Sequence, residues 1–265
     1  TPLHGFRATA LSYIYPMKNR LFSKAGKTFL WFTLILWTAG ISAQTAAPYP
    51  HAYDYQVQKK ATGRRGAVSS AHPLASIVGL DILIRGGNAV DAAIAMQLAL
   101  AVVYPGAGNI GGGGFMIAHM SDGRNIALDY REKAPGAAHR DMYLDKEGQA
   151  QMDKSQQGHL ASGVPGTVAG LLASHAHAKL PFSSLVQPAI DLAQFGFVIT
   201  EAEARGLNGT RASFIKNSTR PTAFVRDRPW KAGDTLVQPE LAATLTRVRD
   251  LGRKGFYEGE TARLI

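Results

Sequence analysis

Residues 73–103 read PLASIVGLDILIRGGNAVDAAIAMQLALAVV, and this stretch decides the fold. Pro73 suits the first turn of a helix, because the first N–H groups of a helix have no partner and proline lacks one. Apolar side chains then recur at helical spacing, at Leu74, Val78, Ile82 and Leu83. Gly86-Gly87 should end this helix, since glycine adopts the left-handed cap conformation at little cost.

A second helix is predicted directly after the first. Asn88 is a favoured N-cap residue, and the helix should extend to about Val103. Most of its faces carry small or apolar side chains, and a helix that is apolar all round is a buried one. Two such helices in succession predict a helical layer lying on a flat element.

The flat element follows in the sequence. Residues 115–120 and 126–130 are strand-like, and the turn residues at 121–123 predict a β-hairpin between them. A further short strand is predicted at residues 66–70, which are apolar and partly β-branched. Helices packed on an antiparallel sheet define an α+β fold.

The rest of the chain is predicted to be mainly helical. Three helices are expected at residues 167–172, at residues 185–195 and from Pro239 onward. Residues 205–235 are predicted to be loop-rich. The last five residues lie within a helical pattern, so we expect the natural gene to continue past Ile265.

The beginning of the chain is predicted to be an export signal. From Met17 the sequence has a basic segment, then an apolar run at 29–41, then small residues ending at Ala43. We therefore predict a signal peptide over residues 17–43, cleaved after Ala43. The apolar run has 13 residues, fewer than the roughly 20 that span a membrane, so no stable membrane anchor is expected.

These features divide the chain into four parts. Residues 1–16 precede Met17 and are interpreted as upstream, non-native sequence or the result of a mis-set start. Residues 17–43 are the signal peptide, and the polar residues 44–65 form a linker. Residues 66–265 form the folded part, which contains neither an internal repeat nor a low-complexity segment.

The net charge of +10 does not indicate a nucleic-acid partner. Five of the basic residues lie within residues 1–43, which contain no acid, and the remainder of the chain carries +5. The remaining Lys and Arg residues are scattered, without the basic stripe or motif of nucleic-acid binders. Hydrophobic residues make up 46% and charged residues 18% of the sequence, a composition typical of a folded protein.

No metal site or cofactor is predicted. The chain has no cysteine, which excludes a disulfide, a Cys-ligated metal and a Cys nucleophile. The histidines show no metal-ligand spacing such as HExxH. The serines also lack the sequence context of a nucleophile elbow.

The glycine-rich stretch GNIGGGG at residues 108–114 is the most unusual local feature. A phosphate-binding loop needs a following Gly-Lys-Ser/Thr and a helix, whereas a strand-like run follows here. It also lacks the context of a dinucleotide site. We interpret it as close backbone packing at the start of a buried strand.

Arg131 follows the predicted second strand of the hairpin, within the run DYREKAP at residues 129–135. A guanidinium group at a strand end can bind a substrate carboxylate through two parallel hydrogen bonds. An internal ion pair with Asp129 or Glu132 is the alternative, and the residues alone do not favour one over the other.

Several blocks together resemble γ-glutamyltransferase, also called glutathione hydrolase, and the bacterial periplasmic branch of that family in particular. They occur in order from residue 66 to the end of the chain, which makes the resemblance specific. The blocks are SAHPLA (70–75), GLDIL (79–83), GGNAVDAA (86–93), GNIGGGGFM (108–116), DYRE (129–132), ASGVPGTVAG (161–170) and GDTLVQP (233–239).

The resemblance implies part of a four-layer αββα N-terminal-nucleophile hydrolase fold. Such a precursor cuts itself into a large and a small subunit, and the new N-terminal threonine of the small subunit attacks the γ-glutamyl bond of glutathione or a related compound. The γ-glutamyl group then passes to water, an amino acid or a peptide. This chain would be the N-terminal part of the large subunit, with the small subunit as its partner, in the periplasm or secreted.

One site residue carries over from the resemblance: Arg131 matches the arginine that binds the α-carboxylate of the γ-glutamyl substrate. No catalytic residue is expected in this chain, since the family's Thr-Thr-His-type block would lie far beyond Ile265. We therefore expect the isolated chain to be inactive. Two alternatives are a cephalosporin (glutaryl) acylase of the same fold and a catalytically inactive binding relative.

Overall fold

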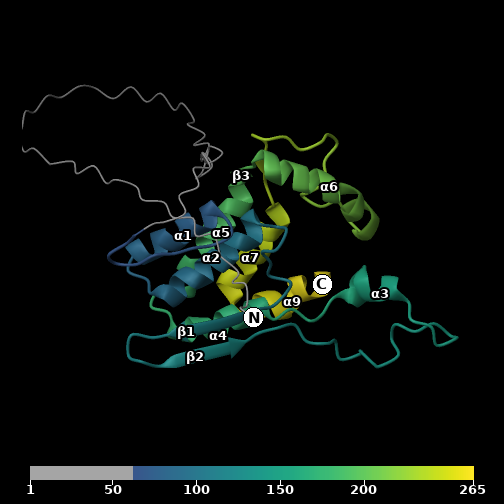
Figure 1. Ribbon diagram of the computed structural model, residues 1–265, viewed down its shortest axis with the longest axis horizontal. Coiled ribbons are helices and arrows are strands. Elements are labelled where there is room, and N and C mark those ends of the chain that lie inside the picture. Colours follow the sequence, from purple (N-terminus) through teal and green to yellow (C-terminus); the bar gives the residue numbers. More distant parts are fainter. Residues whose placement is uncertain (1–61) are drawn as a thin grey trace, which may run out of the picture.

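The computed structural model describes residues 62–265, and its elements are drawn in Figure 1. The predicted signal peptide and most of the predicted linker lie outside these residues. The helices are α1 (Pro73–Ile84), α2 (Ala89–Val103), α3 (Met152–Gln156), α4 (Thr167–Ser174), α5 (Phe182–Phe195), α6 (Glu201–Asn217), α7 (Pro239–Leu251), α8 (Lys254–Tyr257) and α9 (Gly259–Leu264), with short 3-10 turns η1 (His159–Ala161) and η2 (His175–His177). The strands are β1 (Phe115–His119), β2 (Asn125–Asp129), β3 (Phe197–Val198) and β4 (Thr235–Leu236).

The two helices predicted from residues 73–103 are confirmed. Pro73 occupies the first turn of α1, and Gly86 follows the helix with a φ of 94°. Asn88 caps α2 through hydrogen bonds from the Val90 and Asp91 backbone N–H groups. Asp91 completes a capping box by accepting a hydrogen bond from the Asn88 N–H.

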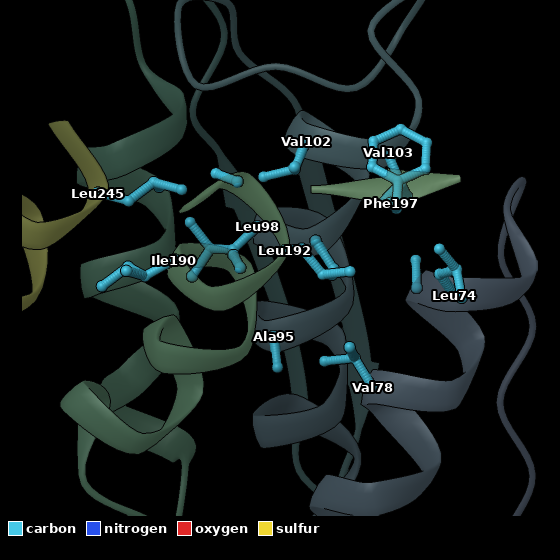
Figure 2. Packing of buried hydrophobic residues seen from close by; sticks show 14 of the residues in the cluster. Leu74, Val78, Ala95, Leu98, Val102, Val103, Ile190, Leu192, Phe197 and Leu245 are labelled. Carbon is cyan, nitrogen blue, oxygen red and sulfur yellow. The ribbon is translucent and has the colours of Figure 1, made fainter. Parts of the chain in front are cut away.

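Helix α2 forms the centre of the hydrophobic core. It packs against α1 on one side and α5 on the other, and α7 packs on α5. Figure 2 shows Leu98 of α2 among side chains of the neighbouring elements, and Leu98, Leu192 and Leu245 are all fully buried. Burying one such side chain contributes about 1.5–3 kcal/mol, so the packing of these helices stabilises the fold.

Asp91 also ties α2 to a distant part of the chain. Its carboxylate is fully buried and accepts hydrogen bonds from the backbone N–H groups of Lys179 (3.0 Å) and Leu180 (2.9 Å), just before α5. The side chain of Asn88 donates to the His177 carbonyl nearby (2.8 Å). The polar residues of the GGNAVDAA block therefore join α2 to the segment before α5, and the bonds to the Asp91 carboxylate are charge-assisted.

The predicted hairpin is confirmed as an antiparallel pair, with Phe115 opposite Asp129 and His119 opposite Asn125. It lies below α1 and α2 beside α4 (Figure 1). The first strand was expected to be buried, and this prediction was wrong. Met116 packs against the core, whereas Phe115 is 62% and Ile117 is 87% exposed. Alternate residues of a strand point to opposite faces, so one face of β1 meets the core and no described residue covers the other.

Two other predictions were wrong. Residues 66–70 form no strand, because neither two-stranded sheet of the described residues extends to them. Residues 205–217, predicted as loop, belong to α6. Thr200 and Glu203 form a capping box that starts this helix, and a capped start outweighs the low mean hydropathy of the segment.

His72 connects the start of α1 to the start of α6. It is buried, and its Nδ1 accepts a hydrogen bond from the Leu74 backbone N–H (3.2 Å). Its Nε2 lies 2.8 Å from Glu203 Oε1, which makes Nε2 the protonated nitrogen of the ring. Burial raises the pKa of Glu203, but hydrogen bonds from His72 and Thr200 outweigh this and hold it below 4.5.

We expect Glu203→Gln to lower the free energy of unfolding by about 1 kcal/mol at neutral pH, because it removes a charge-assisted hydrogen bond. A carboxyl group with a lowered pKa stabilises the fold above its unfolded pKa and ceases to do so as pH falls through the folded pKa. The difference between wild type and Glu203→Gln should therefore shrink below about pH 4.5 in urea unfolding measured over a pH series. Glu201→Gln is the control, because Glu201 lies in the same first turn of α6 but is exposed. If this difference in the free energy of unfolding stayed constant down to acidic pH, the stabilising role of the ionised Glu203 would be contradicted.

Among residues 62–265, no helix is both long enough and apolar enough to cross a membrane. The mixed helical and antiparallel architecture agrees with the predicted α+β class.

Candidate functional site

Arg131 lies two residues after the end of β2, beyond Tyr130. Its backbone N–H donates to Asp129 Oδ1 (2.9 Å), which shapes the turn that leaves the strand. The side chain is 62% exposed, and its guanidinium carbon lies 5.8 Å from the centre of the Phe115 ring. An aromatic face at this distance favours a cation and limits its movement.

The structure contains the ion pair that was the alternative role of Arg131. Arg131 Nε donates to Glu132 Oε2 at 2.9 Å. The Glu132 backbone N–H and the Arg131 side chain both hold the pKa of the Glu132 carboxyl below 4.5. The pair is solvent-exposed, and such pairs contribute little to stability.

The ion pair and a role in carboxylate binding are compatible. Only Nε of Arg131 is engaged, and within residues 62–265 neither of its two terminal nitrogens makes a hydrogen bond. These two nitrogens present parallel N–H donors, the arrangement that matches the two oxygens of a carboxylate. Glu132 can therefore orient the guanidinium while its outer edge remains available to a ligand.

The glycine-rich loop lies against this arginine. Asn109 Oδ1 accepts hydrogen bonds from the Gly112 N–H (2.8 Å) and the Thr167 hydroxyl (3.2 Å). The Gly112 carbonyl in turn accepts from the backbone N–H groups of Gly166 (2.7 Å) and Thr167 (3.0 Å). The loop thus joins β1 to the start of α4. Gly108 and Gly113 face protein backbone, as the close-packing interpretation predicted, whereas Gly112 and Gly114 face side chains and Gly111 has no neighbour within 4 Å.

Tyr130 is a neighbouring residue for which the sequence analysis predicted no role. Its hydroxyl lies 3.1 Å from Gln97 Oε1 on α2 and 3.3 Å from the Phe115 carbonyl. Burial raises the pKa of Tyr130 above 10, with an opposing contribution from the Gln97 hydrogen bond. Its position inside the DYRE block is the only sequence signal that could have indicated it.

The other candidate residues do not gather at this site. His72, His119 and His175 have separate partners: Glu203, Asn125 and the Leu180 carbonyl, respectively. In the described part of the chain, no group of three His, Cys, Asp or Glu residues could hold a metal ion. An open cleft of about 590 Å³ between α1, α5 and α7 contains neither Arg131 nor its neighbours.

Known structures share this architecture. The crystal structure of a gamma-glutamyltranspeptidase from Helicobacter pylori superposes with a TM-score of 0.74 at 46% identity, covering 77% of this chain and 60% of that one. This likeness in fold places the chain in the N-terminal-nucleophile hydrolase class.

The sequence comparisons define the family. The glutathione hydrolase proenzyme of Escherichia coli is 42% identical over 227 residues, and the acylase ACY 1 proenzyme of Pseudomonas sp. strain V22 is 34% identical over 227 residues. The family model for gamma-glutamyltranspeptidase matches residues 75–265. This chain belongs to the gamma-glutamyltranspeptidase family. The alignment with the Escherichia coli protein covers 84% of this chain but only 39% of that protein. The chain therefore corresponds to a part of its relatives.

Proposed function

We propose that this chain is the N-terminal part of the large subunit of an exported glutathione hydrolase, which cleaves γ-glutamyl bonds and transfers the group to water, an amino acid or a peptide. The observation that carries the proposal is Arg131, whose two terminal guanidinium nitrogens have no protein partner in the described residues. In a chain of this family, these donors fit the α-carboxylate of a γ-glutamyl substrate.

In the proposed reaction Arg131 holds the substrate and another part of the polypeptide performs the chemistry. The hydroxyl oxygen of an N-terminal threonine attacks the γ-carbonyl carbon, and its own α-amine accepts the hydroxyl proton. The C–N bond to the leaving group then breaks, and that nitrogen receives the proton. Water or an amine next attacks the γ-glutamyl ester, which releases the product and regenerates the threonine.

The uncovered face of the hairpin supports a partner from the same precursor. Phe115 and Ile117 project side by side from β1 and are exposed in the described residues. Large apolar side chains on a strand normally pack against a second layer. The small subunit of the proposed enzyme would provide that layer.

The signal peptide predicted at residues 17–43 supports a periplasmic or secreted location. It lies outside the described residues, so this proposal rests on the order of its basic, apolar and small residues in the sequence.

An acylase that acts on a glutaryl side chain is the second candidate, because an acylase proenzyme is among the relatives. A glutaryl group keeps a terminal carboxylate at the same position and lacks only the α-amino group, so Arg131 fits both substrates and does not by itself separate the two functions. Full-length protein assayed with a γ-glutamyl anilide and with a glutaryl amide separates the two functions.

We expect the isolated 265-residue chain to show no turnover of a γ-glutamyl anilide, and the full-length protein to be active after self-cleavage. The reason is that the proposed nucleophile lies beyond Ile265. The measurement is release of the aniline by absorbance, with electrophoresis to follow cleavage. Turnover by the isolated chain that Arg131→Ala abolishes would refute this prediction. A full-length protein that neither cleaves itself nor turns over substrate would favour a binding relative.

A further inference from the structure

Three segments of the chain meet around Arg131: residues 112–114, 130–133 and 164–166. Backbone hydrogen bonds join each of them to the other two. Gly114 and Tyr130 pair through Tyr130 N–H to Gly114 O (3.0 Å). Lys133 and Val164 pair through hydrogen bonds of 3.2 and 2.7 Å in the two directions. The Gly166 N–H donates to the Gly112 carbonyl (2.7 Å), so the first and third segments are also joined directly.

Gly113 and Gly166, from two of these segments, lie in close contact with the backbone of the third, which carries Arg131. A Cβ atom on Gly113 would lie 2.7 Å from the Arg131 Cα, and one on Gly166 would lie 2.0 Å from the Tyr130 carbonyl oxygen. Real Cβ atoms do not approach backbone this closely, so only glycine fits at both positions. Neither glycine has a positive φ. The requirement for glycine therefore comes from the neighbouring backbone of residues 130–132.

The ring of Tyr130 is held in the same way. A Cβ on Gly170 of α4 would lie 2.1 Å from the ring, and one on Gly114 would lie 2.8 Å from it. The hydroxyl at the far end of the ring is hydrogen-bonded to Gln97 of α2. Tyr130, which precedes Arg131 in the chain, is thus held against both α2 and α4.

We propose that five glycines, two of them from the glycine-rich loop, form a cradle that positions Arg131 for its ligand. The cradle consists of Gly113, Gly114, Gly163, Gly166 and Gly170. It sets the backbone of residues 130–132, while Glu132 and the Phe115 ring orient the guanidinium group. The proposal rests on the proposed carboxylate-binding role of Arg131, and the cradle acts only through that residue.

The test compares Gly113→Ala with Gly111→Ala in the full-length protein. Both substitutions add one methyl group to the same loop, but a Cβ on Gly111 meets nothing within 4 Å. Each variant is assayed with a γ-glutamyl anilide and with the same compound carrying an α-carboxamide in place of the α-carboxylate. Because a misplacement of about 1 Å can cost up to roughly 100-fold, Gly113→Ala should reduce the preference for the carboxylate about 10- to 100-fold. Gly111→Ala should leave it within about twofold.

A purely structural role would lower the rates for both compounds equally and leave their ratio unchanged, which would overturn the proposal. Addition of Gly113→Ala to Arg131→Ala provides a second test, because a cradle that acts through Arg131 should then change the ratio by less than about twofold. If Gly113→Ala yields no folded protein, Gly163→Ala replaces it, since its Cβ would meet the Glu132 side chain at a milder 3.0 Å.

The two proposals fail in distinguishable ways. If Arg131→Ala itself retains the preference for the α-carboxylate, the carboxylate-binding role of Arg131 is wrong. If Arg131→Ala abolishes the preference and both Gly113→Ala and Gly163→Ala preserve it, the cradle is wrong and the proposed function stands.

Discussion

Arg131→Ala in the full-length protein should lower kcat/KM for a γ-glutamyl anilide by about 10²- to 10³-fold. Loss of one partner from a hydrogen-bonded charge pair costs roughly 2–5 kcal/mol, which is about 30- to 4,000-fold, and the expected loss lies within that range. Arg131→Lys should be intermediate, because an ammonium group keeps the charge but not the two parallel donors. Steady-state kinetics with both variants measures the effect.

Arg124→Ala is the matched control for this substitution. Arg124 lies in the turn of the same hairpin, is similarly exposed and also pairs through Nε with a nearby carboxylate, that of Asp122, at 2.8 Å. Its removal should change kcat/KM by less than about threefold, since exposed surface substitutions have small effects. Equal losses in Arg124→Ala and Arg131→Ala would mean that general charge attraction, not carboxylate binding by Arg131, explains the result.

Asp91→Ala should lower the free energy of unfolding by about 3–4 kcal/mol. The substitution leaves the partly buried N–H groups of Lys179 and Leu180 without their buried acceptor and removes the capping interaction at Asn88. Each unsatisfied buried donor costs about 1–3 kcal/mol. Asp91→Asn keeps one carbonyl acceptor and should cost about half as much. Urea denaturation of the three proteins measures the differences.

Asp81→Ala controls for the loss of an acid from the same helical layer. Asp81 is exposed on α1 and makes only a surface pair with Arg85 at 3.4 Å. Its removal should change the free energy of unfolding by no more than about 0.5 kcal/mol. An Asp91→Ala variant as stable as Asp81→Ala would show that the connection between α2 and the start of α5 holds without this carboxylate.

The most accurate sequence predictions concern elements whose signals lie within a few residues. Pro73 and Gly86 bound α1, Asn88 caps α2, and the turn at residues 121–123 sets the hairpin. Each depends on local backbone preferences and nearby hydrogen bonds, which a short stretch of sequence contains in full. The role of Arg131 was inferred from its position after a strand and from the block that surrounds it, and it stays a prediction.

The wrong predictions concern features that depend on distant partners. A strand at residues 66–70 needs a neighbouring strand, and none is present in the described residues. A buried strand was predicted after the glycine-rich stretch, but Phe115 and Ile117 of β1 are largely exposed among the described residues. Helix α6 begins at a capping box whose Glu203 also contacts His72, 131 residues away in the chain.

The sequence by itself determined the order of the elements, the position of the helical core and the family to which the blocks point. Helix caps, turns and apolar spacing are local properties, so they can be recognised without knowledge of the fold. Only the tertiary structure shows which backbone atoms require glycine at Gly113 and Gly166. Gly113 and Gly166 are far apart in sequence, and only the folded chain brings both against residues 130–132, where a single methyl group would collide with backbone. Contact between distant segments is a property of packing, and that packing determines where Arg131 lies.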